Sequence, residues 1–402
     1  MSSSLLIIAT LVSGLLVGLI PTFVDGIQSS LQSRLKLADG RVKWYVGLFY
    51  LTWLPAMPLA GWMLDSWPNK EVLFYSLVAL LLGIAWLALV RSGVSLMLNA
   101  MFLGLAYSCV TTAAINFMAP EVFFPDDIRH HTARGWEFGL HFAALNFGFI
   151  AVGLGAMLGP WILRALERWW GYRQGLLYLS LALIAPAALA ALCDRSQFPT
   201  PVSDRPLSDV VSWQEIVTHP HMGLMVVVIL LYFALENCLE FWPESYLREL
   251  GYQDRGLQAG MFVFWLAFLA TRGLAAWWFF EHPSHAFILT LVLVVLSAFV
   301  LGNLTGGFEF GSGSLGFWLL GACYGPLLPG FLGMALELYQ PRSIPISVLG
   351  GLLALSGLDT LAVRPFMSLF GKDRPARSIM WAPTVLALIL AAPLLLLALV
   401  PK

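Results

Sequence analysis

The sequence predicts an all-α polytopic membrane protein, with about twelve transmembrane helices arranged as two pseudo-symmetric six-helix bundles. Its composition, its long apolar runs and an internal repeat support this prediction. Of the 402 residues, 59% are hydrophobic and only 11% are charged, and the mean hydropathy is +0.80. Soluble domains carry about 45–50% apolar and roughly 25% charged residues. The composition therefore excludes a cytosolic enzyme and a disordered protein.

Net charge and motif content exclude further classes of protein. The formal net charge is −1, so no basic face is available to bind nucleic acid. The sequence contains no nucleophile elbow, zinc-protease, Walker or dinucleotide-binding motif, so we expect neither an enzyme nor a cofactor. No partner spacing supports a metal site at the histidines near the fourth-to-fifth loop, which we expect to be solvated (His130, His131, His141). All four cysteines lie in apolar surroundings, which indicates neither disulfides nor a metal cluster (Cys109, Cys193, Cys238, Cys323).

Long apolar runs recur along almost the whole chain. A bilayer core about 30 Å thick needs about 20 apolar residues per helix, and unpaired backbone groups are too costly there for other structures. The first run lacks a basic leader and a cleavage site, so we interpret it as a retained helix. The runs predict spans near residues 5–31, 43–64, 72–91, 95–120, 137–163, 174–193, 221–247, 257–280, 284–302, 313–338, 344–367 and 379–400.

One long polar stretch interrupts these runs and separates six spans from six. It contains Pro199, Pro201 and Pro206 and then a mildly amphipathic piece, features that are typical of a linker. The predicted domains are therefore an N-terminal bundle over 1–193, a cytoplasmic linker over 194–220 and a C-terminal bundle over 221–402.

The two halves resemble each other in sequence. Leu-Gly-x-x-Tyr ends at Tyr107 in the fourth span and at Tyr324 in the tenth, and each motif is followed by a glutamate, Glu121 or Glu337, with a proline four positions later. The separation between matched positions is nearly constant. Two six-helix halves in parallel repeat are typical of a large class of transporters.

A loop motif after the second span extends this interpretation. Gly61-Trp-Met-Leu-Asp65-Ser-Trp-Pro-Asn-Lys70 resembles the Gly-x-x-x-Asp-Arg-x-Gly-Arg-Lys loop of the major facilitator superfamily, and Gly61, Asp65 and Lys70 match that motif. The resemblance implies a gating role for these three residues. Asp65 is expected beside the N-terminus of a neighbouring helix, where the helix dipole favours an anion.

Three further stretches resemble the same family. Gly153–Pro160 is similar to its Gly-rich fifth span, and Trp170–Arg173 is similar to the turn into its sixth. Gly321–Pro329 resembles the broken tenth span of sugar and organic-anion permeases. Pro326 and Pro329 remove helical donors and are expected to bend this span.

The resemblance and the loop charges disagree on orientation. The family topology implies a multi-pass protein of the cell (inner) membrane with both termini and the 65–70 loop in the cytoplasm. Seven Lys and Arg residues would then lie on the cytoplasmic side and thirteen on the other, which opposes the positive-inside rule. We follow the family topology because Asp65–Lys70 and Gly171–Arg173, on opposite faces, agree on it.

Ionisable residues at membrane depth are costly, so each is a candidate for function. Spans three, six, nine and twelve contain none in their interiors, and in the family fold these spans form an outer scaffold. Glu236 is in the middle of the seventh span, with Asn237 beside it and Glu240 one turn later. The two glutamates share a helix face, and their repulsion is suited to proton binding. A structural ion pair between Glu236 and an arginine such as Arg272 is the alternative.

The remaining candidates are distributed over five other spans. Arg272 or Arg364 can clamp a substrate carboxylate or phosphate, and a gate salt bridge is the alternative for each. The complete set of proposed substrate- or proton-binding residues is Asp25, Gln28, Tyr107, Glu236, Asn237, Glu240, Arg272, Tyr324, Asp359 and Arg364.

The sequence therefore predicts a secondary active transporter that moves a small polar solute, a sugar or an organic anion, by alternating access with protons. We expect a monomer whose partners are the bilayer, the solute and protons. Efflux of amphipathic compounds or flipping of lysolipids is an alternative, because 16 Trp and 27 Phe supply aromatic surfaces. A non-transporting membrane receptor is a third hypothesis.

Overall fold

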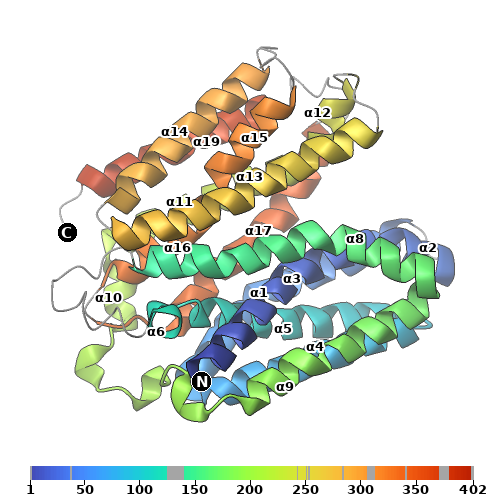
Figure 1. Ribbon diagram of the computed structural model, residues 1–402, viewed down its shortest axis with the longest axis horizontal. Helices are drawn as coiled ribbons and strands as arrows, with labels where there is room; N and C mark the ends of the chain where they lie inside the picture. Colours follow the sequence, from blue (N-terminus) through green and yellow to red (C-terminus); the bar gives the residue numbers. More distant parts are fainter. Residues whose placement is uncertain are drawn as a thin grey trace. The chain divides into compact units, whose positions relative to one another are not determined.

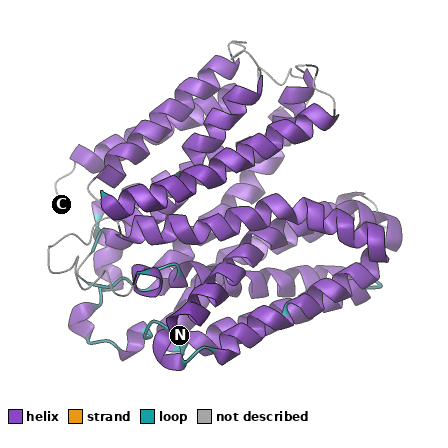
Figure 2. Ribbon diagram, in the orientation of Figure 1, coloured by secondary structure: helices purple, strands orange, loops and turns teal. Residues whose placement is uncertain are grey.

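The structure is a computed structural model that describes residues 2–36, 39–124, 140–241, 243–249, 251, 254–282, 285–305, 313–339, 342–370 and 380–399. The described backbone is mainly helical (Figures 1 and 2). Eleven of the described helical segments are long and apolar enough to cross a membrane, and one of these, Leu140–Leu192, is 53 residues long. The predicted all-α polytopic membrane fold is confirmed.

The helices follow the predicted order of spans. The first half contains α1 (Ser2–Gly26), α2 (Gln28–Leu35), α3 (Asp39–Ser66), α4 (Asn69–Leu89), α5 (Gly93–Phe117), α6 (Pro120–Phe123), α8 (Leu140–Ala182) and α9 (Ile184–Leu192). The second half contains α10 (Trp213–Thr218), α11 (Pro220–Phe241), α12 (Pro243–Glu249), α13 (Asp254–Glu281), α14 (Ala286–Thr305), α15 (Gly313–Tyr324), α16 (Leu327–Glu337), α17 (Ile346–Phe370) and α19 (Trp381–Leu399). Short 3-10 turns at Arg195–Gln197, Val202–Asp204 and Leu207–Asp209 occupy the predicted linker.

The 53-residue segment consists of two spans joined at Gly171. This glycine has φ 72° and ψ 166°, a non-helical conformation that L side chains rarely adopt. The chain reverses its course within α8 and returns along the last part of α8 and then α9 (Figure 1). Counted as two, this segment brings the described spans to twelve, with the break at the predicted Trp170–Arg173 turn.

Two other helix breaks bear on the site. The first span was predicted to continue to residue 31, but α1 ends at Gly26 and Gln28 starts the separate helix α2. The tenth span is broken as predicted, because α15 ends at Tyr324 and α16 begins at Leu327, after Pro326. Proline lacks an N–H, so it is tolerated where a helix starts and disfavoured inside one.

The Gly-rich part of α8 lies directly against α1. A Cβ atom at Gly155 would clash with the Leu15 carbonyl, and one at Gly159 would clash with the Thr22 hydroxyl. Small residues let membrane helices approach closely, because dispersion contacts rather than the hydrophobic effect hold helices together in lipid. The glycines therefore account for the tight α1–α8 packing.

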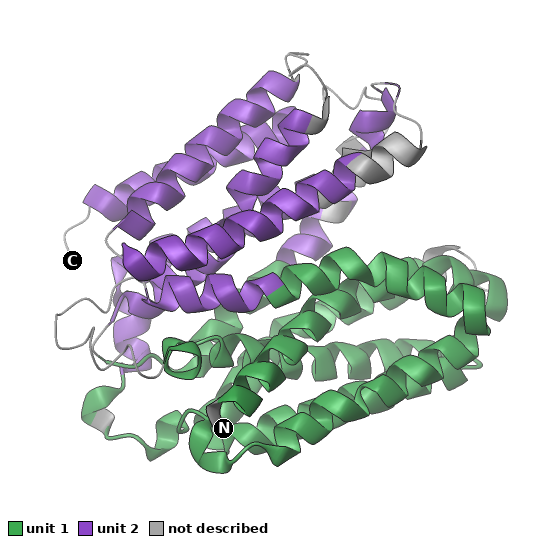
Figure 3. Cartoon of the chain, viewed as in Figure 1, with its two compact units in different colours: residues 1–126, 151–210, 342–357 green, residues 127–150, 211–341, 358–402 purple. Residues whose placement is uncertain are grey.

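The chain forms two compact units (Figure 3). Unit 1 contains residues 1–126, 151–210 and 342–357, and unit 2 contains residues 127–150, 211–341 and 358–402. Two helices therefore belong to both units: α8 enters unit 1 after Ile150, and α17 leaves it after Gly357. The two units are defined by which residues contact one another, and they do not coincide with the two halves of the sequence repeat. The six-plus-six division at residues 194–220 stays a prediction.

Candidate functional site

Several of the candidate residues lie together in unit 2, and the first pair is on α11. Tyr232 donates its hydroxyl to Glu236 Oε1 at 3.1 Å, one helical turn away. Glu236 is half-buried, whereas Tyr232 is fully buried. Glu240 belongs to α11 as well, but its side chain lies outside the described set, so the proposed repulsion between Glu236 and Glu240 stays a prediction.

A second polar group joins α11 to α17. Thr360 donates its hydroxyl to Asn237 Oδ1 at 3.4 Å, and Asn237 Nδ2 donates to the Phe233 carbonyl at 3.0 Å. Asp359, next to Thr360, is only 6% exposed, and its Oδ2 atom is buried with no hydrogen-bond partner among the described residues. A carboxylate in such surroundings is strongly disfavoured unless it takes up a proton or a cation.

Arg272 on α13 is also buried, with 3% exposure. Its Nε donates to the Gly325 carbonyl at 2.7 Å, and its Nη1 donates to the Phe149 carbonyl at 2.6 Å. The guanidinium carbon lies 4.1 Å from the ring centroid of Phe268 and 5.2 Å from that of Phe149. Carbonyl dipoles and aromatic faces thus surround this cation.

Pro329 explains why the Gly325 carbonyl is available to Arg272. In a regular helix, this carbonyl would accept from the amide four residues later, and that position is proline, which has no N–H. Arg272 supplies the missing donor. The proline that was expected to bend the tenth span therefore also creates the acceptor for a buried cation.

The ion pair considered between Glu236 and Arg272 is not formed. The ion pairs found in the described part of the chain are His141–Glu337 and Arg195–Glu71, and neither involves Arg272. Glu236 is nevertheless close enough to Arg272 to interact with it electrostatically. Arg364 lies in α17, but its side chain is outside the described residues.

The two repeat tyrosines are both buried, each in its own unit. Tyr107 on α5 donates to the Val17 carbonyl at 2.9 Å and stacks on Trp53, with ring centroids 4.8 Å apart. Tyr324, at the end of α15, lies near Tyr232, with ring centroids 6.4 Å apart. Tyr324 therefore accompanies the polar groups of α11, whereas Tyr107 belongs to an aromatic cluster of unit 1.

Asp25 and Gln28 lie at the junction of α1 and α2. Tyr50 on α3 donates its hydroxyl to Asp25 Oδ2 at 3.1 Å. Gln28 Nε2 donates to the Asp25 backbone carbonyl at 3.1 Å, so its amide bridges the helix break. Both side chains are half-buried.

The loop motif lies against the start of α17. Asp65 accepts hydrogen bonds from the backbone amides of Ile346 at 2.6 Å and Ser347 at 3.0 Å, and from the Ser347 hydroxyl at 2.7 Å. Free amides and the helix dipole make a helix N-terminus favourable for a carboxylate. Gly61 permits this approach, because a Cβ atom there would lie 2.5 Å from Ser347 Cα.

Lys70 has a different neighbour. Its Nζ donates to the Cys193 carbonyl at 2.6 Å, at the C-terminal end of α9. A cation at this position satisfies a free carbonyl and complements the helix dipole. Asn69 similarly donates to the Pro199 carbonyl at 2.8 Å. Asp65 and Lys70 therefore bind separate elements.

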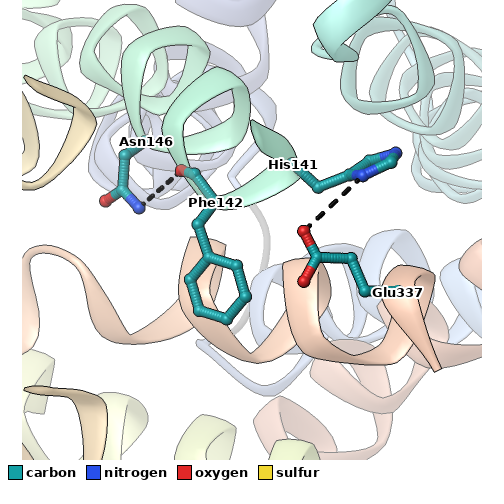
Figure 4. A network of polar contacts seen from close by, with 4 residues as sticks. All are labelled: His141, Phe142, Asn146 and Glu337. Carbon is teal, nitrogen blue, oxygen red and sulfur yellow. Dashed lines mark hydrogen bonds and ion pairs between the residues drawn. The ribbon is translucent and has the colours of Figure 1, made fainter. Parts of the chain in front are cut away.

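A further contact in unit 2 was missed by sequence reasoning. His141, expected in a solvated loop, lies in the first turn of α8, with Nδ1 3.7 Å from Oε1 of Glu337 on α16 (Figure 4). Beside it, the Phe142 ring packs on Phe279 with centroids 5.3 Å apart, and a Cβ atom at Gly333 would lie 2.9 Å from that ring. His130 and His131 lie outside the described residues.

These contacts join spans of the two predicted halves. The helix ends nearest to these contacts are Ser66, Leu140, Glu281, Glu337 and Ile346. Because successive spans cross the membrane in alternating directions, all five ends are expected on the same side of the membrane. The Asp65 contact lies within unit 1 and the His141–Phe142 contact within unit 2.

Comparisons with known proteins agree with this architecture. A family model described as the Major Facilitator Superfamily matches residues 5–357. No curated protein sequence matches the chain. Among solved structures, the human organic anion transporter MFSD10 (TETRAN) is 14% identical, with a TM-score of 0.72 and coverage of 98% of both chains.

Two further solved structures are similar to nearly the same extent. The transporter FucP, in its outward conformation, is 16% identical, with a TM-score of 0.68 and coverage of 96% of this chain and 97% of FucP. The proton:xylose symporter XylE, bound to 6-bromo-6-deoxy-D-glucose, is 13% identical, with a TM-score of 0.67 and coverage of 97% and 94%. At these identities the likeness concerns the fold, whereas the family model covers most of the sequence. The chain belongs to the Major Facilitator Superfamily and is a multi-pass membrane transporter of a small-molecule substrate, not an enzyme.

Proposed function

We propose that this transporter carries a small polar solute, a sugar or an organic anion, by alternating access and that protons drive it. The observation that carries the proposal is the buried Asp359 carboxyl, whose Oδ2 has no hydrogen-bond partner in the described part of the chain. At membrane depth, an uncompensated charge costs roughly 2.5–3.5 kcal/mol or more. A group that gains and loses a proton during the cycle carries this cost in one state only.

Glu236 is the second proposed proton-binding residue. It shares α11 with Asn237, which contacts Thr360 next to Asp359, so both carboxyl groups belong to one polar region of unit 2. Protonation of Glu236 would remove a negative charge that interacts with Arg272. This electrostatic link is a physical route by which a proton changes the affinity of Arg272 for an anionic solute.

The proposed solute class is supported by residue chemistry and by the structural neighbours. Arg272 is a buried cation suited to a carboxylate or phosphate, while Tyr324 and Asn237 supply hydrogen-bonding groups that a sugar also uses. An organic anion transporter and a proton:xylose symporter are among the structures of similar fold. Asp25, Gln28 and Tyr107 of the first half stay proposed contributors to solute binding. Glu240 and Arg364 of the second half are proposed contributors as well.

We further propose that Gly61 and Asp65 form a gate contact with α17 that breaks in the opposite conformation, and that Lys70 supports the loop through α9. Both termini and the 65–70 loop are proposed to face the cytoplasm in a cell (inner) membrane. We also propose that the protein functions as a monomer.

Uptake by the purified protein tests the proposal. A thermal-shift screen against sugars and organic acids identifies a solute, whose labelled form is then offered to proteoliposomes. We expect the uptake rate to change when a pH gradient is imposed across the proteoliposome membrane. A protonophore, which collapses that gradient, should abolish the change. Uptake that ignores the gradient would contradict proton coupling, and stabilisation by lysolipids alone would favour the flippase alternative.

A further inference from the structure

The first three turns of α8 are held to second-half helices by three kinds of contact, all within unit 2. His141 pairs with Glu337 at the helix start, and Phe142 packs between Phe279 and Gly333. Two turns later, the Phe149 carbonyl accepts from Arg272 Nη1 at 2.6 Å. A movement that separates α8 from α13 and α16 must break all three contacts.

The Arg272 contact differs from the other two because it involves a cation with incomplete compensation. Both of its acceptors are neutral carbonyls, of Gly325 and Phe149, and Nη2 engages no acceptor among the residues that the structure describes. A carboxylate or phosphate carries a full negative charge and can accept two parallel hydrogen bonds from a guanidinium, whereas each carbonyl presents only a dipole. A carboxylate or phosphate that reached Arg272 would therefore compete effectively with the two carbonyls.

We propose that Arg272 is an anion-responsive staple that holds α8 to α13 through the Phe149 carbonyl. When a solute carboxylate or phosphate binds the guanidinium, the hydrogen bond to Phe149 breaks and α8 can separate from α13. The inference rests on the proposed transport function and narrows its solute class to anions. Gly325 is the second acceptor, so the anion changes the contact at the break between α15 and α16 as well. One side chain thereby links anion binding both to α8 and to the break between α15 and α16.

The geometry provides a reporter for this staple and a matched control. A Cβ atom at Gly273, next to Arg272, would lie 3.9 Å from Ile150 Cδ1, so a cysteine pair at Ile150 and Gly273 joins α8 to α13. A Cβ atom at Gly302 would lie 3.8 Å from Thr384 Cγ2, so a pair there joins α14 to α19, both in the second half. Each pair is placed in the full-length chain after its four native cysteines are replaced by serine or alanine.

Cross-linking of both pairs with a short bifunctional thiol reagent is then measured with benzoate, inorganic phosphate or glucose as the probe. We expect benzoate or phosphate to lower the yield of the Ile150–Gly273 pair about fivefold, at the lower end of usual coupling between sites. Glucose should leave that yield unchanged, and no probe should alter the Gly302–Thr384 pair.

Variants of the staple complete the test. With Arg272→Gln, the Ile150–Gly273 yield should be low without any anion and insensitive to all three probes. Arg272→Lys retains the charge but cannot hold two carbonyls in forked geometry, so its yield should be intermediate and still fall with anions. An unchanged Gly302–Thr384 yield in each variant shows that the fold is retained.

A yield that no anion changes, in a protein with Arg272 intact, would overturn the staple. So would a yield that falls equally with glucose, or an Arg272→Gln protein that still responds to benzoate. These outcomes concern anions and α8 alone. Proton-driven uptake of a solute would still support the proposed function, and its absence would contradict that function whatever the cross-linking result.

Discussion

The Asp65 carboxylate accepts hydrogen bonds from both the backbone amide and the hydroxyl of Ser347, at 3.0 and 2.7 Å. These two residues are 282 positions apart in the sequence, and their contact joins the last turn of α3 to the first turn of α17. Charge, dipole and hydrogen bonds all favour the same arrangement. The contact explains why a carboxylate is needed at this position in a chain with so few charges.

Replacing Asp65 by asparagine should weaken this contact. Asp65→Asn removes the negative charge and one acceptor oxygen while nearly preserving size, so we expect a loss of about 1–2 kcal/mol of unfolding free energy. Thermal unfolding of the purified protein checks this. Asp204→Asn, at an exposed aspartate of the linker, is the control and should unfold as the original chain does. Equal stability of the two variants would show that the Asp65–Ser347 contact contributes little.

Two glycines of α3 should respond differently to the same small change. Gly61→Ala places a Cβ atom 2.5 Å from Ser347 Cα, whereas Gly47→Ala meets nothing within 4 Å. We expect Gly61→Ala to separate α3 from α17 and to lower both transport and stability, since overpacking usually costs about 1–3 kcal/mol. Gly47→Ala should be neutral or slightly stabilising. Solute uptake and thermal unfolding measure both, and similar behaviour of the two variants would contradict the close α3–α17 approach.

Adjacent glycines of α17 extend this test to a second point of the same contact. Gly350 lies directly against the Met57 carbonyl and Pro58, whereas a Cβ atom at Gly351 would meet nothing within 4 Å. Gly350→Ala should impair transport, and Gly351→Ala should not. Because the two positions are neighbours, helix propensity and membrane depth are matched. An impairment at Gly351 equal to that at Gly350 would be inconsistent with the structure.

Phe142 should contribute substantially to the contact of α8 with α13 and α16. Phe142→Ala removes a buried ring that packs on Phe279 and Gly333, and such truncations cost about 3–5 kcal/mol in soluble cores. We expect a lowered unfolding temperature and easier separation of α8, measured with the Ile150–Gly273 cysteine pair. Phe147→Ala is the control on the same helix, because Phe147 is 40% exposed. A milder effect at Phe142 than at Phe147 would contradict the packing described.

Orientation in the membrane is a separate prediction. Ser203→Cys in the linker and Arg91→Cys between α4 and α5 are both exposed and lie on opposite sides of the membrane by the order of spans. In intact cells, an impermeant thiol reagent should label Arg91→Cys only. Labelling of Ser203→Cys from outside would show the opposite orientation, which is the one that the excess of Lys and Arg on the other side, thirteen against seven, favours.

The helical architecture was predictable because its signals are local. Apolar runs of about 20 residues have one stable solution in a bilayer, so the spans could be located from composition alone. The turn at Gly171 and the break at Pro326 were also found, since glycine and proline act on their own backbone. The first span was overextended to residue 31, because Ile27 and Leu31 preserve its apolar pattern across the helix break.

The candidate site was only partly predictable, because its contacts connect distant segments. Arg272 was identified as a buried charge, but its partners are backbone carbonyls, which carry no sequence signal of their own. Pro329 was the one available sequence signal for the Gly325 carbonyl, since this proline leaves that carbonyl without a helical donor. His141 was wrongly assigned to a solvated loop, because the start of α8 follows a polar stretch and its partner Glu337 is almost 200 positions away.

The central claim, that a buried carboxyl couples protons to transport, is tested most directly at Asp359. Asp359→Asn retains the size and polarity of this side chain but cannot release a proton. In proteoliposomes, we predict that this variant still exchanges labelled for unlabelled solute when solute is present on both sides, yet no longer accumulates it in response to a pH gradient. Accumulation at the original rate by Asp359→Asn would contradict the account.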